Sequence, residues 1–235
     1  RDLSKGDTMT ADSVFWIASM TKAITTAAGM QLVEQGKLSL DEPIGKLLPD
    51  LASPQVLEGF DAKGEPKLRA AKKPITLRHL MTHTAGFCYH LWNGDMVSYL
   101  EKTGTPEITS CKNAALKTPI MTDPGTRWEY GTNIDFVGKA IEAVSGKRLD
   151  AYLRDSLFKP LGMIDTGFWV PPEKLARLID PPAGVPMRPD RDVTKPTTMF
   201  SGSGGLVSTA ADYLRVCPML VNGGELDGGG ILSAS

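Results

Sequence analysis

The stretch Ser19-Met20-Thr21-Lys22 constrains this chain most, because it sets a serine and a lysine three residues apart where a predicted helix begins. Residues three apart lie on the same face of a helix, so the hydroxyl and the amine point at one spot. A serine needs a base within hydrogen-bond distance to act as a nucleophile, and a partly neutral lysine can be that base. The helix is predicted over 19–35 with an apolar stripe formed by Met20, Ile24, Ala28 and Leu32.

A second stretch, Ser156-Leu157-Phe158-Lys159, has the same spacing, and motifs this short recur by chance. It lies near the end of a helix predicted over 149–158 and stopped by Pro160, where a lysine faces the negative end of the helix dipole. Ser19 instead lies where backbone N–H groups point outward and the dipole is positive. That end disfavours a protonated lysine and favours a developing oxyanion, so only the first stretch has a chemical rationale.

Composition excludes several classes of protein. The 235 residues are 41% hydrophobic and 23% charged with a net charge of -1, which is typical of a globular chain of one or two domains. There is no basic patch to follow a phosphate backbone, so no nucleic-acid partner is predicted. No apolar run approaches the roughly 20 residues that span a bilayer, so no membrane segment is predicted.

The three cysteines, Cys88, Cys111 and Cys217, are too scattered for a disulfide framework or a zinc site. We expect free thiols, which favour a reducing, cytoplasmic compartment. His79 and His83 are four apart but lack the glutamate of a zinc-protease motif and a third ligand, so structural histidines are predicted. Gly202–Gly205 lacks the order of a phosphate-binding loop, so neither a metal nor a cofactor is predicted.

Helices and loops dominate the rest of the chain, and strands are few. Ser201–Ser208 reads as a short glycine-rich strand, and the opening residues read as another piece bordering a sheet. Residues 50–74 are predicted to be a surface excursion and residues 165–200 an extended loop. Further helices are predicted over 44–48, 77–83 with Thr76 as N-cap, 95–102, 133–145, and 210–221 with Thr209 as N-cap.

Several segments, in one order along the chain, carry a family resemblance: Trp16–Lys22, Leu80–Gly86, Pro124–Asn133, Pro160–Met163 and Gly204–Asp212. Together they resemble the serine β-lactamase and penicillin-binding-protein superfamily, with family VIII carboxylesterases nearest and class C β-lactamases next. The resemblance implies an α+β fold of the β-lactamase/transpeptidase type. Such a fold has a mainly helical domain and an antiparallel sheet domain.

The resemblance also implies roles at matching positions. Ser19 is similar to the family's acyl-forming nucleophile, Lys22 to the lysine that shares in proton abstraction, and Tyr130 to the tyrosine that relays the proton to the leaving group. A tyrosine becomes a usable base only beside a positive charge, which Lys22 supplies. Whether Lys22 or Tyr130 holds the proton at rest is a coupled question that the sequence leaves open. The Ser19 backbone N–H would form half of an oxyanion hole.

The loop after Gly86 lines the substrate pocket in this family, which implies that Tyr89, His90 and Trp92 contact the substrate. Ordinary surface packing is the alternative for these three. Asn133, and Gly204 from the strand expected to line the cleft, complete the predicted substrate-binding set.

Two departures from the family pattern bear on these expectations. The lactamase Tyr-x-Asn motif has Thr132 here at the asparagine position, with Asn133 one place late, which favours the esterase branch. The third motif, Lys-Thr-Gly or Trp-Gly-Gly on a late strand, has no match after Ser208. We therefore expect residues 1–235 to be one hydrolase region without the family's first and last strands, and with an incomplete oxyanion hole.

The sequence thus predicts a serine hydrolase that cleaves short-chain carboxylic esters through an acyl-serine intermediate. One alternative is a β-lactamase or D-Ala-D-Ala peptidase, and another is a penicillin-binding sensor that is acylated without turnover. In each case the partner is a small-molecule ester or lactam. The oligomeric state is not predicted.

Overall fold

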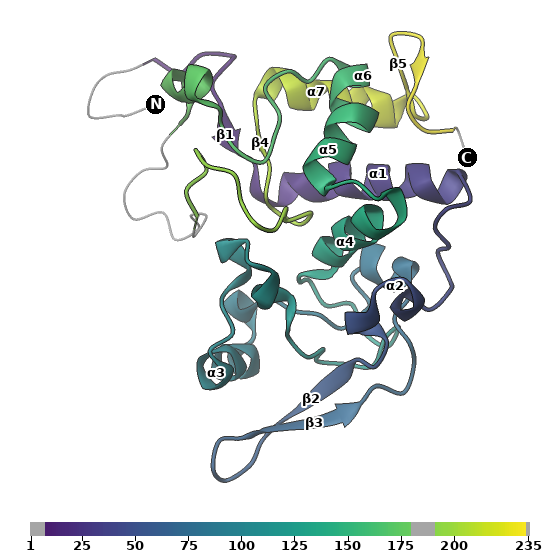
Figure 1. The fold of residues 1–235 in the computed structure, drawn as a ribbon, viewed down its shortest axis with the longest axis vertical. Coiled ribbons are helices and arrows are strands. Elements are labelled where there is room, and N and C mark those ends of the chain that lie inside the picture. The colour runs from purple at the N-terminus through teal and green to yellow at the C-terminus, as the bar shows by residue number, and fades with distance from the viewer. Residues whose placement is uncertain (1–7, 180–190, 234–235) are drawn as a thin grey trace.

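Helices surround a central helix pair in the computed structural model, which describes residues 8–179 and 191–233 (Figure 1). The central pair is α1 and α4, and α4 also packs against α2 and α5. The helices of the described part are α1 (Thr21–Glu34), α2 (Leu77–Met81), α3 (Gly94–Thr103), α4 (Asn133–Ser145), α5 (Leu149–Leu153), α6 (Lys159–Leu161) and α7 (Ala210–Val221).

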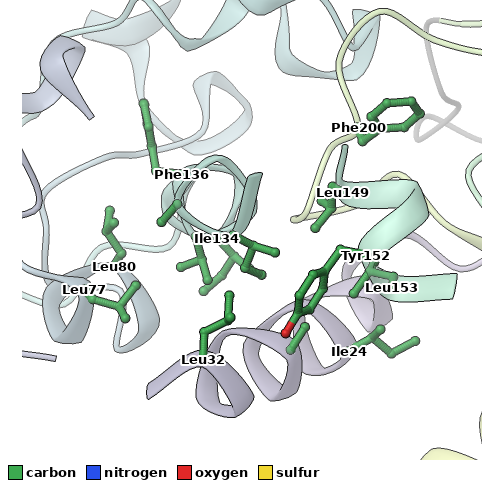
Figure 2. Packing of buried hydrophobic residues seen from close by; sticks show 14 of the residues in the cluster. Ile24, Leu32, Leu77, Leu80, Ile134, Phe136, Leu149, Tyr152, Leu153 and Phe200 are labelled. Atoms are coloured by element: carbon green, nitrogen blue, oxygen red, sulfur yellow. The ribbon is translucent and has the colours of Figure 1, made fainter. Parts of the chain in front are cut away.

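The apolar stripe of α1 forms one wall of the core. Ile24 and Leu32 are buried and face side chains of α4 and α5, among them Ile134 and Tyr152 (Figure 2). Met20, predicted to belong to this stripe, is 46% exposed, because it precedes α1 in a 3-10 turn that does not keep the helix period. Gly29 permits close helix packing, because a Cβ there would lie 2.6 Å from the Met81 side chain and 3.1 Å from that of Val137.

Several helices begin or end at the capping residues that the sequence predicts. Helix α4 has the bounds predicted for 133–145 and stops at Gly146, which has a φ of 67°. The Thr209 side chain accepts a hydrogen bond from the Asp212 N–H at the start of α7. Thr76 caps α2 in the same way, and the His79 ring accepts from the Thr76 N–H in return.

The prediction that a helix ends before Pro160 is wrong. Helical backbone continues from Leu149 through a π-helical stretch, Arg154–Phe158, into α6, and ends at Gly162 with a φ of 67°. A proline inside a helix lacks one N–H bond and crowds the carbonyl four residues earlier. The π-helical turn just before Pro160 widens the backbone and so accommodates the ring.

The predicted sheet pieces meet as an antiparallel pair. β1 (Phe15–Trp16) pairs with β4 (Val207–Ser208), with Phe15 opposite Ser208. This pair joins the start of the chain to the glycine-rich segment and, together with the helices, confirms the predicted α+β fold. The strand is shorter than predicted, because residues 202–204 form a turn.

Two hairpins were not predicted. Residues 50–74 contain β2 (Gln55–Phe60) and β3 (Pro66–Ala70), which project away from the helices (Figure 1). Asp61 shapes their turn, since its carboxylate accepts from the Lys63 and Glu65 N–H groups. A second small hairpin is formed by β5 (Glu225–Leu226) and β6 (Gly229–Gly230).

Short 3-10 turns replace other predicted features. The helix expected over 44–48 is a turn at Ile44–Lys46, and Pro49 begins a second turn, Pro49–Leu51, instead of closing the first. Within the loop expected over 165–200, Pro172–Arg177 forms a 3-10 helix, while 180–190 lies outside the described residues. None of the helices in 8–179 and 191–233 is long and apolar enough to cross a bilayer.

Ile141 and Ile164 offer a matched test of this core. Ile141 in α4 is fully buried, whereas Ile164 is 78% exposed. We expect Ile141→Ala to lower the free energy of unfolding by about 2–5 kcal/mol, because it leaves a cavity. Ile164→Ala should change it by less than about 0.5 kcal/mol. Urea unfolding checks both, and equal losses would contradict the packing described.

Candidate active site

Ser19 sits in a 3-10 turn, Ala18–Met20, which leads directly into α1. The preceding strand is fixed to the glycine-rich segment, because the Trp16 indole N–H donates to the Gly204 carbonyl at 2.5 Å. Ala18 has a φ of 44°, in the left-handed region that residues other than glycine rarely adopt. Strain of this kind is found where the surrounding structure enforces it, and here it turns the chain sharply just before Ser19.

Lys22 is one helical turn further on and is surrounded by oxygen atoms. Its Nζ donates to Ser19 Oγ at 3.1 Å, to the Tyr89 hydroxyl at 3.1 Å and to the Ser203 carbonyl at 2.9 Å. Three acceptors match the three N–H bonds of an ammonium group. The arrangement therefore satisfies a charged lysine while holding it against the serine.

Tyr130 is the third residue of the catalytic set predicted from the sequence. Its hydroxyl donates to Ser19 Oγ at 2.7 Å, and Lys22 Nζ lies 4.7 Å from its ring centre. The structure thus brings together three polar groups: one from the turn before α1, one from the first turn of α1, and one from a loop 111 positions along the chain from Ser19.

Gly131 explains how the Tyr130 loop can come so close to the Tyr89 loop. A Cβ at this position would lie 2.3 Å from the Phe87 carbonyl oxygen and 2.6 Å from the Cys88 Cα. Because only glycine allows this backbone contact, the two loops can set their tyrosines with ring centres 5.4 Å apart.

His83 supports the Tyr130 ring from behind, with ring centres 4.9 Å apart. Its Nδ1 lies 3.0 Å from the Asn133 amide nitrogen, so Nδ1 is the acceptor and the ring is neutral. Burial, and to a lesser extent the Lys22 charge, lower the pKa of His83 from 6.5 to about 4. His83 is therefore a structural histidine that adds no charge beside Tyr130.

Asn133 is not placed to contact a substrate, so that prediction is corrected. It is the first residue of α4 and is fully buried, with its amide nitrogen near the His83 ring and the carbonyls of Phe87 and Glu129. Asn133 does not line the cavity beside Ser19. Thr132, at the family's asparagine position, is also buried.

A cavity of about 110 Å³ opens beside Ser19. Of the predicted substrate contacts, Tyr89, His90, Trp92 and Gly204 lie on its wall. Trp92 is also 67% exposed and places its ring 5.8 Å from that of Tyr130. The wall includes further residues that were not predicted to contact a substrate: Trp16, Ala18, Leu91, Ile108, Thr109, Cys111, Arg191, Ser201 and Ser203.

Burial sets the protonation of the other groups on this wall. It raises the pKa of Tyr89 well above 10, so the hydroxyl facing Lys22 stays a neutral phenol. It also raises the pKa of the Cys111 thiol, which disfavours the reactive thiolate. The three cysteines are free thiols, as predicted, and Cys217 is exposed. In 8–179 and 191–233, no three His, Cys, Asp or Glu side chains cluster as metal ligands.

The family model described as Beta-lactamase matches residues 1–235, and the chain belongs to this family. It is thus a member of the serine β-lactamase and penicillin-binding-protein superfamily that the motifs resembled.

Several relatives are acyl-transfer or ester-cleaving enzymes by name. The chain is 42% identical over 176 residues to acyltransferase mokF of Monascus pilosus, covering 73% of this chain and 42% of that protein. It is 32% identical over 233 residues to lovastatin esterase of Penicillium rubens, covering 92% of this chain and 57% of that protein. A variant of simvastatin synthase (LovD) from Aspergillus terreus superposes with a TM-score of 0.80 at 32% identity. The superposition covers 96% of this chain and 54% of that one. The chain therefore spans about half the length of the relatives it matches.

Gly131→Ala should disturb the site through the backbone contact just described. We expect it to lower the free energy of unfolding by about 1–3 kcal/mol, because the new methyl group overlaps the Phe87 carbonyl. Gly94→Ala is the matched control, since nothing lies within 4 Å of a Cβ there. It should leave stability unchanged or raise it by up to about 1 kcal/mol, because alanine restricts the unfolded chain. Chemical unfolding of both variants tests this, and an undisturbed Gly131→Ala would refute the close approach of the loops.

His83 should make the fold sensitive to acid. Its folded pKa of about 4 lies below the unfolded value of 6.5, so the neutral ring contributes stability that is fully present above pH 6.5. That contribution is lost as the pH falls through about 4. We expect His83→Gln to flatten the pH dependence of the unfolding free energy in this window, measured by urea denaturation. An unchanged slope in the variant would show that His83 is not buried as a neutral ring.

Proposed function

We propose that this protein is a serine hydrolase that cleaves carboxylic esters through an acyl-Ser19 intermediate. One observation carries the proposal: Ser19 Oγ lies within hydrogen-bond distance of both Lys22 Nζ, at 3.1 Å, and the Tyr130 hydroxyl, at 2.7 Å, at the edge of a cavity. A nucleophile with two neighbouring groups that can take and return its proton is what acyl transfer requires.

The first half-reaction acylates the serine. In the reactive form, the Lys22–Tyr130 pair lacks one proton and accepts that of Ser19 while Oγ bonds to the ester carbonyl carbon. The positive helix end at α1, with the Ser19 N–H, stabilises the oxyanion. As the carbonyl re-forms, the C–O bond to the alcohol breaks, and the pair returns the proton to the alcohol oxygen.

The second half-reaction transfers the acyl group to an acceptor. Water as acceptor gives an esterase, and a second alcohol gives an acyltransferase, with the same proton steps in reverse order. The names of the relatives, an esterase and acyltransferases, support both outcomes for a site of this kind. The small cavity of about 110 Å³ beside Ser19 supports a short acyl group on the serine.

The ester function is preferred over a lactamase or peptidase function because of Thr132 and Asn133. In class C β-lactamases, which this chain resembles, an asparagine two residues after the tyrosine helps to hold the lactam side chain. Thr132 is buried, and the Asn133 amide is held by the protein interior. This supports an ester substrate, with β-lactam reaction as a side activity.

Ser19→Ala in the complete protein is the direct test. We expect turnover of short p-nitrophenyl esters, and transfer to an added alcohol, to fall about a thousandfold or more, because no acyl-enzyme can form. Ser156→Ala is the matched control, as it alters the second Ser-x-x-Lys stretch and should leave turnover unchanged.

Full activity of Ser19→Ala would refute the proposal. Mass spectrometry after incubation with a cephalosporin separates the alternatives. A persistent adduct without ester turnover would favour a penicillin-binding sensor, and cephalosporin hydrolysis faster than ester hydrolysis would favour a lactamase.

A further inference from the structure

Asp135 is a buried carboxylate that the reaction scheme above leaves without a role. It is the third residue of α4, five positions after Tyr130, and only 2% of it is exposed. Its Oδ1 accepts two hydrogen bonds, from the Ser201 hydroxyl at 2.6 Å and from the Ser203 N–H at 3.1 Å. A carboxylate is rarely buried this completely without a partner that requires it.

The two hydrogen bonds hold the turn that contacts the lysine. Ser203, whose N–H is bound by Asp135, offers its carbonyl to Lys22 Nζ at 2.9 Å. Ser201, bound through its hydroxyl, accepts in turn from the Gly204 N–H at 3.2 Å. A single residue, Ser203, therefore links the Asp135 carboxylate to the carbonyl that positions the catalytic amine.

The negative charge of Asp135 also interacts with the Lys22 amine. The Ser203 N–H can only donate, and the Ser201 hydroxyl donates to the same oxygen, so both bonds favour the charged carboxylate. Oδ2 has no hydrogen-bond partner among the described residues. Burial raises the pKa of Asp135, opposed by Ser201, Ser203 and the Lys22 charge. The titratable groups that face it are Lys22 from α1, and Tyr89 and Cys111 from the loops, and of these only Lys22 is a cation.

We propose that Asp135 is a positioning residue for Lys22: it fixes the 201–204 turn whose carbonyl holds the amine, and its carboxylate keeps positive charge on the Lys22–Tyr130 pair. The inference rests on the proposed function of Ser19. It gives a role to the aspartate that lies on the first turn of α4, five residues after Tyr130. It also predicts that the pair gives up its proton at a higher pH than it would beside a neutral residue.

Asp135→Asn tests the charge while retaining an oxygen that can accept both hydrogen bonds. The pH profile of kcat/KM for a p-nitrophenyl ester, measured on the complete protein, reports the deprotonation of the pair in the free enzyme. We expect the acid limb to move to lower pH by about one unit, since a nearby opposite charge is removed.

Asp212→Asn is a closely matched control. Asp212 is also the third residue of its helix, α7, is 5% exposed, and accepts from a backbone N–H, that of Asp165 at 2.7 Å, and from the Thr166 hydroxyl at 2.8 Å. It lies outside the cavity beside Ser19. Its substitution should leave the pH profile unchanged even where it lowers the thermal midpoint. An acid limb that stays in place in Asp135→Asn, or moves equally in Asp212→Asn, would overturn the inference.

Ser201→Ala tests the positioning half and remains informative if Asp135→Asn does not fold. It removes one of the two hydrogen bonds and keeps the carboxylate, so we expect kcat to fall about tenfold with the acid limb in place. An unchanged kcat would contradict the positioning role. Ser19→Ala distinguishes failure of the proposed function from failure of this inference. Full activity of Ser19→Ala would refute the proposed function. Loss of activity in Ser19→Ala, together with an unshifted pH profile in Asp135→Asn, would refute only the role of Asp135.

Discussion

The Lys22 ammonium and its three oxygen acceptors are the interaction on which the rest of the site depends. Ser19 comes from the turn before α1, Tyr89 from the loop after α2 and the Ser203 carbonyl from the glycine-rich segment. A charge this close to apolar walls is stable only when its donors are satisfied, so the lysine ties three distant segments to one point. The same contacts hold it against the nucleophile, so structural and chemical requirements coincide.

The fold supplies the rigidity that this point needs. Helix α1 carries Lys22 on its first turn, directly after the 3-10 turn that holds Ser19, and buries Ile24 and Leu32 against α4 and α5 (Figure 2). Helix α4 begins three residues after Tyr130 and carries Asp135 on its first turn. The packing of α1 on α4 therefore fixes the distance between the two sources of catalytic groups.

The sequence was sufficient where a local pattern determines the structure. Ser19 and Lys22 lie three apart at a helix start, and α4 and α7 have unbroken apolar periods with caps. It was insufficient where contacts between distant segments decide. The apolar residues of the β2–β3 hairpin do not alternate, and Gly59 and Pro66 interrupt its strands, so the sequence does not distinguish it from a loop. Pro160 is accommodated by a preceding π-helical stretch. Asp135 reads as a polar helix position, and its ties to Ser201 and Ser203 are visible only in the fold.

Locating a trapped acyl group is the most direct test of the account. The complete protein would be incubated with a slowly deacylated ester, quenched in acid, digested and analysed by peptide mass spectrometry. The account predicts a single acyl group on the peptide that contains Ser19, which forms and disappears at the rates of the ester reaction. An acyl group on another residue, or steady turnover with an unmodified Ser19 peptide, would contradict it.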